Sequence, residues 1–341
     1  MPFGYYADAM HFDTGAAPLR HVLEGRQFSA EWLLQELFPR ADLMRQIHAL
    51  GDSRLLTGRR LLQLFYQPST RTRLSFESAM TLLGGTASGL EVSREDRQRD
   101  DEPLEDRVRV LCSYGYDLLL IRYHEEGGAR RAATVSSVPV INAGDGDGEH
   151  PTQALLDAYT ILRELGRLDD LEIAFVGDLT YERSVNSLAE LLAKLPGVRL
   201  RFISPETLRL RSGVRERLET AGAAFDETDD LAAVAPMADV VYLTRAHSDR
   251  MALAQRFEPA PRSYGVDAEL LASMKPGAIV LHPLPRGPEL PMGIESDRRV
   301  ACFRQAENGL YVRMALLTLL LGPNPLKQSE GAGSRETPGA P

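Results

Sequence analysis

The sequence predicts an α/β fold with two doubly wound parallel-sheet domains, in which helices cover both faces of each sheet. Short apolar segments alternate with amphipathic segments along the chain, which is the pattern of βα units in parallel sheets. The length of 341 residues is about that of two ordinary domains. A Gly/Asp-rich loop at 143–149 precedes a helical segment and a fresh βα series, so the domain junction is placed there.

Each expected strand is a short apolar run bounded by polar or turn residues, and each expected helix has apolar residues at helical spacing. The expected strands cover 61–66, 118–122, 138–142, 172–176, 198–203, 239–244, 278–281 and 300–303. The expected helices cover 29–49, 72–83, 105–114, 153–165, 183–195, 205–221, 267–274 and 308–321. Residues 323–341 are rich in Pro, Gly and Ser and cannot bury apolar surface, so a disordered tail is expected there.

The composition excludes several classes of protein. A hydrophobic content of 43% with 26% charged residues is that of a globular protein, and a net charge of −9 argues against a nucleic-acid-binding surface. The two cysteines, Cys112 and Cys302, are too few for a disulfide framework or a metal cluster. No membrane span or signal segment is evident. We therefore expect a soluble protein of the cytoplasm that does not bind membranes.

The most informative segment is 61–80, where a strand-like run breaks at Pro68 and leads into a helix. Ser69, Thr70, Arg71 and Thr72 form the turn. A helix start offers free backbone N–H groups and a positive dipole end, and arginine adds paired donors suited to phosphate oxygens. The alternative is an ordinary N-capped helix whose arginines point into water.

Other strand ends also carry polar residues, and ligands of open α/β sheets bind outside the carboxyl ends of the strands. These residues are Arg122, Asn142 with the following loop to His150 and Gln153, Asp178 with Arg183, Thr244 with Arg245 and His247, and the run His282-Pro283-Leu284-Pro285-Arg286. A single arginine of this kind is usually a surface residue, and a single histidine is usually structural. Their joint placement indicates one binding site.

With these motifs the chain resembles the aspartate/ornithine carbamoyltransferase family, and within it the catalytic chains of the aspartate branch. The resemblance covers about residues 20–322. The family-wide mark is Pro-Ser-Thr-Arg-Thr-Arg at 68–73. The marks of the aspartate branch are Asn-Ala-Gly-Asp-Gly from 142, His-Pro-Thr-Gln at 150–153, Val-Gly-Asp-Leu at 176–179, Leu-Thr-Arg at 243–245, His-Pro-Leu-Pro-Arg at 282–286 and Arg-Gln-Ala-Glu-Asn-Gly-Leu-Tyr at 304–311.

This resemblance implies a carbamoyl-phosphate-binding domain at 1–149 with 307–322 and an amino-acid-binding domain at 150–306. The last helix is expected to cross back to the first domain. The resemblance also implies a homotrimer of pyrimidine biosynthesis with active sites shared between subunits, either alone or within a higher assembly. The expected substrates are carbamoyl phosphate and a small amino acid, aspartate or a close analogue.

The resemblance also assigns roles to individual residues. Arg71, Thr72, Arg122 and His150 are the expected catalytic residues. The phosphate is expected at Ser69, Thr70, Arg71 and Thr72; the carbonyl oxygen at Thr72, Arg122 and His150; the carbamoyl NH₂ at Gln153 and the backbone of Pro283 and Leu284; and the acceptor carboxylates at Arg183, Arg245 and His247. Negative charge develops on the carbonyl oxygen and the phosphate, so fixed donors there lower the barrier without a metal or cofactor.

The loop at 91–107 departs from the family pattern. A gapless count puts Asp96 and Asp100 where the aspartate branch has a serine and a lysine that reach the neighbouring subunit's site. Three interpretations follow: Arg97 or Arg99 replaces the lysine; the acidic loop receives another amine, such as a diamino acid; or the chain is an inactive binding homologue. A solvated loop is compatible with each of them.

Two smaller departures lie beside expected site residues. Tyr123 and His124 follow Arg122 where the family has His-Pro, and His247 stands where a glutamine is usual. A dinucleotide-binding enzyme is a weak alternative, because Gly177 follows a strand but no G-x-G-x-x-G motif accompanies it.

Overall fold

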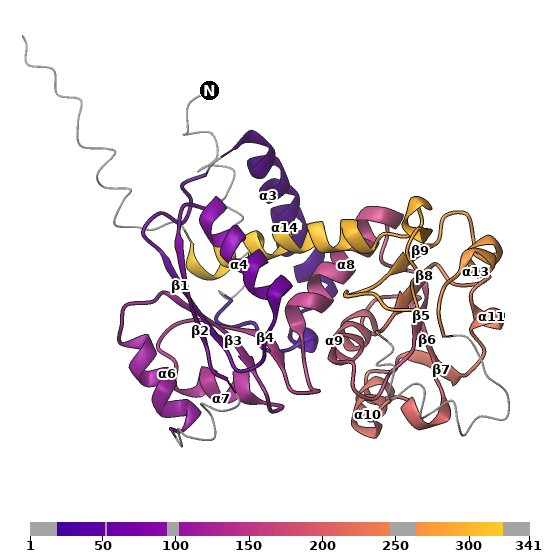
Figure 1. Cartoon of the computed structure of the whole chain (residues 1–341), viewed down its shortest axis with the longest axis horizontal. Helices are drawn as coiled ribbons and strands as arrows, with labels where there is room; N and C mark the ends of the chain where they lie inside the picture. The colour runs from indigo at the N-terminus through magenta and orange to yellow at the C-terminus, as the bar shows by residue number, and fades with distance from the viewer. Residues whose placement is uncertain (1–18, 52, 94–101, 246–263, 323–341) are drawn as a thin grey trace, which may run out of the picture.

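A computed structural model describes residues 19–51, 53–93, 102–245 and 264–322, and these form two parallel sheets set side by side (Figure 1). The first sheet has the order β2-β1-β3-β4, with β1 at Arg60–Phe65, β2 at Thr86–Glu91, β3 at Leu118–Tyr123 and β4 at Val140–Asp145. The second has the order β7-β6-β5-β8-β9, with β5 at Glu172–Val176, β6 at Arg199–Ile203, β7 at Ala224–Thr228, β8 at Val240–Leu243 and β9 at Ile279–Leu281. All pairs of neighbouring strands are parallel.

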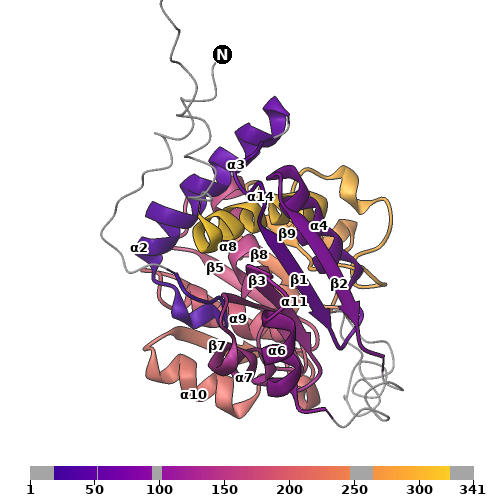
Figure 2. The same ribbon diagram turned by 90° about the vertical axis from the view of Figure 1, so that its left-hand side faces the viewer.

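Helices cover both faces of each sheet. On the first sheet, α3 (Phe38–Leu50), α4 (Thr70–Leu82) and α14 (Cys302–Leu321) lie on one face, and α6 (Leu104–Cys112) and α7 (Gly128–Val135) lie on the other (Figures 1 and 2). On the second sheet, α9 (Arg183–Leu192) and α10 (Ser212–Thr220) lie on one face, and α11 (Leu231–Val234) and α13 (Ala268–Ser273) lie on the other. Shorter elements are η1 (Gly25–Gln27), α2 (Ala30–Trp32), η2 (Leu33–Leu37), η3 (Glu206–Leu208) and η4 (Ile294–Ser296).

Alternation along β1 explains this double covering. Leu61 and Phe65 belong to the apolar core under α3, α4 and α14, whereas Leu62 and Leu64 belong to the core under α6 and α7. Successive side chains of a strand point to opposite faces, so an apolar run is buried on both sides. The doubly wound fold expected from the sequence is confirmed.

Two long helices join the sheets. Helix α8 (Pro151–Leu165) packs on α14 and on α9, and α14 runs from the second sheet across to α3 and α4 of the first (yellow in Figure 1). Leu155 on α8 and Leu316 on α14 are fully buried in one core that also includes Leu61 and Phe175 from the two sheets. The expected return of the last helix to the first domain is therefore confirmed. None of the described helices is long and apolar enough to span a membrane.

Some of the expected elements differ from the observed ones. Strand β5 is where it was expected, but β2 and β7, both at sheet edges, were not foreseen. The strand expected at 300–303 is wrong: Val300 makes only an isolated bridge with Val280, and α14 already begins at Cys302. The expected tail at 323–341 lies outside the described residues. The domain boundary at 149/150 stays a prediction.

Candidate active site

A cavity of about 790 Å³ lies where the strands of both sheets end. Every expected site residue that the structure describes lines it: Ser69, Thr70, Arg71, Thr72, Arg122, His150, Gln153, Arg183, Arg245, Pro283 and Leu284. His247 lies outside the described residues. The cavity therefore collects side chains from segments that are far apart in the sequence, at the edge where ligands of open α/β sheets bind.

Three helices begin at this cavity. Helix α4 begins after Ser69, α8 after His150 and α9 after Glu182, and all three of these residues line the cavity. In none of the three does the side chain of the N-cap residue accept a hydrogen bond from the helix. The first N–H groups and the positive ends of the helix dipoles consequently favour an anion here.

Five arginines line the same cavity: Arg71, Arg122, Arg183, Arg245 and Arg313. Burial, the larger cause, and the neighbouring Arg183 together lower the pKa of Arg122 to about 9. Burial also lowers the pKa of Arg313 to about 10. The pKa of Arg71 is lowered by burial and then by Arg245. Mutual repulsion among desolvated cations is relieved by a bound anion, so the cavity suits a ligand with several negative charges.

The close packing of Arg122 and Arg183 depends on Gly144, near the end of β4. Arg122 Nη1 donates to Ala143 O at 3.2 Å, and Arg183 Nη1 donates to Gly146 O at 2.6 Å. Gly144 has φ 114°, and a Cβ there would lie 2.9 Å from Arg183 Nε. A side chain at this position would strain the backbone and push the guanidinium away. The glycine thus lets the two arginines share one wall of the cavity.

His150 is held at the start of α8 as a neutral ring. Burial lowers its pKa well below the ordinary value, and Arg183, Arg122 and Arg313 lower it further. Its backbone N–H donates to Ser187 Oγ at 2.8 Å, which ties this turn to α9. A neutral imidazole carries one N–H, so His150 can donate a hydrogen bond without adding charge.

The loop after β9 completes the cavity. Leu284 N donates to His282 Nδ1 at 2.8 Å, and Leu284 O accepts from Arg71 Nη2 at 2.5 Å. His282 Nε2 lies 2.8 Å from Glu289 Oε1, so the ring is held on both sides. Leu284 has φ 57°, a strained backbone conformation that a leucine rarely adopts, and residues held in this way cluster at functional sites. The contact with Arg71 joins the second sheet to the helix of the first.

Several lining residues were not assigned to the site from the sequence, among them Glu182, Gln305 and Arg313. Arg313 is 5% exposed in the otherwise apolar C-terminal half of α14, and a lone charge in an apolar helix was an available signal. Glu182 is the only carboxylate among the described lining residues. Gln305 lies in the Arg-Gln-Ala-Glu-Asn-Gly-Leu-Tyr motif at 304–311, but the resemblance assigned it no role in the site.

The unusual Tyr123 and His124 do not line the cavity. The Tyr123 ring packs edge-on against Tyr66 at 4.7 Å between centroids, and the His124 ring lies 4.3 Å from that of Tyr123. This departure from the family pattern is thus an aromatic cluster outside the cavity. Residues 96–100 of the divergent loop lie outside the described residues, so the expectation for this loop stays a prediction.

Two family models match consecutive parts of the chain. Residues 20–163 match the carbamoyl-P binding domain of aspartate/ornithine carbamoyltransferase, and residues 169–320 match its Asp/Orn binding domain. The chain belongs to the aspartate/ornithine carbamoyltransferase family. The prediction of a carbamoyltransferase is confirmed.

Individual relatives agree with the family match. The chain is 47% identical over 306 residues to the chloroplastic aspartate carbamoyltransferase of Arabidopsis thaliana, covering 89% of this chain and 78% of the relative. It is 43% identical over 304 residues to the aspartate carbamoyltransferase catalytic subunit of Methanopyrus kandleri, covering 89% and 97%. The structure of the Trypanosoma cruzi aspartate transcarbamoylase with carbamoyl phosphate and aspartate matches with a TM-score of 0.82 at 36% identity, covering 89% and 97%.

One expectation is contradicted by these relatives. The sequence led us to expect a cytoplasmic protein, but the matching plant enzymes of Arabidopsis, rice and pea are chloroplastic. The cytoplasmic assignment rested on the lack of an evident targeting segment, which is weak support, because such segments are recognised only by composition.

Proposed function

We propose that this carbamoyltransferase transfers the carbamoyl group of carbamoyl phosphate to the α-amino group of aspartate and releases phosphate. The observation that carries the proposal is the convergence of five arginines and three helix N-termini on one cavity. The two substrates together carry a phosphate and two carboxylates, which match this concentration of positive charge. The relative whose structure holds carbamoyl phosphate and aspartate supports the same pair.

In this proposal the start of α4 holds the phosphate through Ser69, Thr70, Arg71 and Thr72. Arg122, His150 and Thr72 donate to the carbonyl oxygen, and Gln153 with the backbone of Pro283 and Leu284 holds the NH₂ group. Arg183, Arg245 and His247 bind the acceptor carboxylates. All of these that the structure describes line the cavity, and His247 lies outside the described residues.

The reaction forms a bond between the amine nitrogen and the carbamoyl carbon and breaks the bond from that carbon to the phosphate oxygen. The departing phosphate accepts the proton that the amine loses. Negative charge that develops on the carbonyl oxygen is met by the preorganised donors of Arg122 and His150, and each such donor contributes about 3 kcal/mol in comparable sites. Holding the amine against the carbon supplies a further part of the rate.

The test is to incubate the protein with carbamoyl phosphate and an amino acid and to follow phosphate release and the carbamoylated product by mass spectrometry. Carbamoyl-aspartate is the expected product. Ornithine belongs in the panel, since Glu182 places a carboxylate in the cavity and would favour a diamino acid. If phosphate is released with ornithine but not with aspartate, the acceptor must be reassigned. If none of the amino acids supports phosphate release, the proposal is overturned.

We further propose that the chain forms a homotrimer, either alone or within a higher assembly, with active sites shared between subunits. Leu74, on the rim of the cavity, is 47% exposed, and Leu90 on the edge strand β2 is 39% exposed. Exposed apolar side chains beside a site support burial against a second subunit. Light scattering on the eluting protein should give three times the chain mass of 37.7 kDa, and a monomer that is active would refute shared sites.

The same proposal divides the chain by substrate. Residues 1–149 with 307–322 would bind carbamoyl phosphate, and residues 150–306 would bind the amino acid. The family models change from one domain to the other between residues 163 and 169, at the far end of α8. Either boundary leaves the start of α8 facing the cavity.

A further inference from the structure

We propose that Asp157, a residue of α8 that does not line the cavity, is a positioning residue that fixes the amide orientation of Gln153 and couples it to the loop at 282–284. The inference rests on the proposed function, because it assigns Gln153 to the NH₂ group of the carbamoyl donor. Asp157 is fully buried, and its carboxylate joins three elements.

The hydrogen bonds of Asp157 come from α8, α14 and β8. Asp157 Oδ1 accepts from Gln153 Nε2 at 2.9 Å and from Gln305 Nε2 at 2.6 Å. Asp157 Oδ2 accepts from the hydroxyl of Tyr242 at 2.9 Å. Burial raises the pKa of this carboxyl to about 7, although all three hydrogen bonds lower it. A carboxyl group buried at this cost and so fully bonded has a structural or functional reason to be there.

The donor and acceptor roles in this series of hydrogen bonds are fixed by its last member, the backbone of His282. The backbone N–H of His282 can only donate, and it donates to Gln305 Oε1 at 2.8 Å. The NH₂ group of Gln305 must then face Asp157, so Asp157 Oδ1 is an acceptor. The NH₂ group of Gln153 is consequently also turned toward Asp157. An amide orientation is normally ambiguous, but here a backbone donor settles it.

This orientation leaves Gln153 Oε1 as the atom that faces the cavity, which Gln153 lines. An oxygen there can accept a hydrogen bond from a ligand NH₂ group, whereas a ligand methyl group has no donor for it. The other expected contact of that NH₂ group is the backbone of Pro283 and Leu284, next to His282. Asp157 and Gln305 therefore connect both sides of the NH₂ subsite through three hydrogen bonds.

The test compares two stable ligands, phosphonoacetamide and phosphonoacetone, which differ only in NH₂ against CH₃. Calorimetry with the full-length protein should show that the wild type binds phosphonoacetamide about tenfold more tightly than phosphonoacetone. This ratio corresponds to the free energy of one hydrogen bond, which the ketone cannot form. In Asp157→Ala the Gln153 amide is free to turn over, and the preference should fall to about twofold. Inorganic phosphate, which has no NH₂ group, should bind to both proteins equally.

Two variants separate orientation from general damage. Asp157→Asn keeps an acceptor oxygen for Gln153 and Gln305 and should restore the preference. Tyr242→Phe removes only the donor to Oδ2 and should leave the preference unchanged. If Asp157→Ala does not fold, Gln305→Leu removes the link between Asp157 and the backbone N–H of His282, and it should lower the preference through the loop at 282–284 while Asp157 still orients Gln153.

An unchanged preference in Asp157→Ala, or in Gln305→Leu, would overturn the inference, as would a wild type with no preference for the amide. Failure of the proposed function has a different signature, because the wild type would then bind neither phosphonate. These outcomes can be read from one set of titrations.

Discussion

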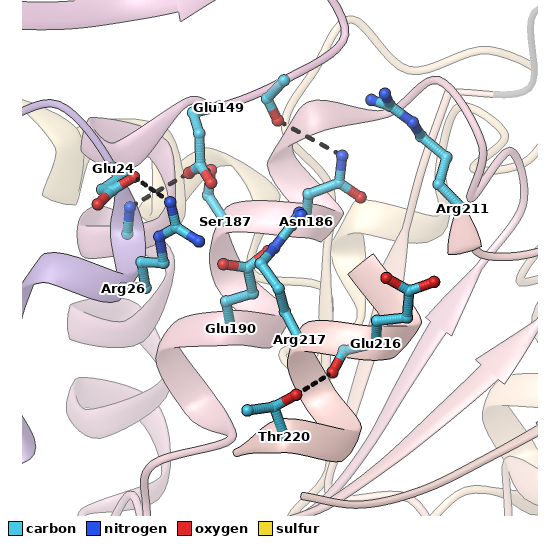
Figure 3. Close-up of polar contacts among 12 residues, drawn as sticks. Glu24, Arg26, Glu149, Asn186, Ser187, Glu190, Arg211, Glu216, Arg217 and Thr220 are labelled. Carbon is cyan, nitrogen blue, oxygen red and sulfur yellow. Dashed lines mark hydrogen bonds and ion pairs between the residues drawn. The ribbon is translucent and has the colours of Figure 1, made fainter. Parts of the chain in front are cut away.

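Glu149 lies in the turn between β4 and α8, and its carboxyl group should make the stability of this protein depend on pH. Glu149 Oε2 accepts from Ser187 Oγ at 2.5 Å and from Gly25 N at 3.2 Å (Figure 3). Burial raises its pKa from 4.5 to about 7, opposed by the Ser187 hydrogen bond and assisted by Glu190 and Glu24. The proton is thus bound more tightly in the folded state than in the unfolded state.

The sign of the effect follows from proton binding. Below pH 4.5 both states carry the proton, and the stabilising contribution is fully present. As the pH rises toward 7, the unfolded state loses its proton first, so the free energy of unfolding falls. A pKa raised from 4.5 to about 7 corresponds to about 3 kcal/mol, at roughly 1.4 kcal/mol for each pH unit.

The substitution Glu149→Gln removes this titration and keeps an acceptor oxygen for Ser187 and Gly25. We expect the variant and the wild type to be of similar stability at pH 4.5 and the variant to be more stable at pH 8 by up to about 3 kcal/mol. The surrounding charges do not change: Glu24 is paired with Arg26 at 2.9 Å, and Glu190 with Arg217 at 2.6 Å.

The assay is urea unfolding followed by circular dichroism at several pH values and one protein concentration, because the stability of the proposed trimer would depend on concentration. Glu216→Gln is the matched control, because Glu216 lies on the neighbouring α10 and is exposed (Figure 3). A Glu149→Gln variant whose stability changes with pH exactly as that of the wild type does would refute the reasoning.

Three further predictions concern the site. Arg71→Ala should weaken the binding of phosphonoacetamide by about 10- to 100-fold in calorimetry, which is the range for the loss of a charged donor. Arg73→Ala on the same helix is the control and should leave the affinity unchanged, because Arg73 does not line the cavity; equal losses in both variants would remove Arg71 from the site. Arg183→Gln should raise the KM for the acceptor by at least tenfold, and unchanged steady-state kinetics would contradict its role. Asp100→Lys should improve aspartate turnover if a repurposed acceptor site explains the acidic loop, whereas an unchanged rate would mean that the gapless count is wrong.

The elements that the sequence predicted well are those with strong local patterns. The apolar strand at 172–176 and the helix that follows Pro68 have clear boundaries, and their positions in the structure agree. The edge strands β2 and β7 have few buried side chains, so neither an apolar run nor an alternation marks them. The run at 300–303 is apolar in part because Val300 and Cys302 are buried at the start of α14, and periodicity alone cannot separate such a short run from a strand.

The expected site residues could be found because phosphate and carboxylate recognition needs recognisable residue types at strand ends and helix starts. The residues that hold these site residues in position could not be found in this way. Gln305 and Asp157 are 148 residues apart, and their contact exists only because α14 returns to pack on α8. A long-range hydrogen bond leaves no period or motif in the sequence.

The amino-acid sequence alone thus determined the α/β class, the anion-binding turn at 68–73 and the family, because these depend on local propensity and on motifs that lie within short segments. Tertiary structure alone decided the rest. The convergence of five arginines, the neutral state of His150 and the orientation of Gln153 depend on burial and on distances between segments from both sheets. Burial and electrostatic interactions act through space, so only the packed fold sets their magnitude.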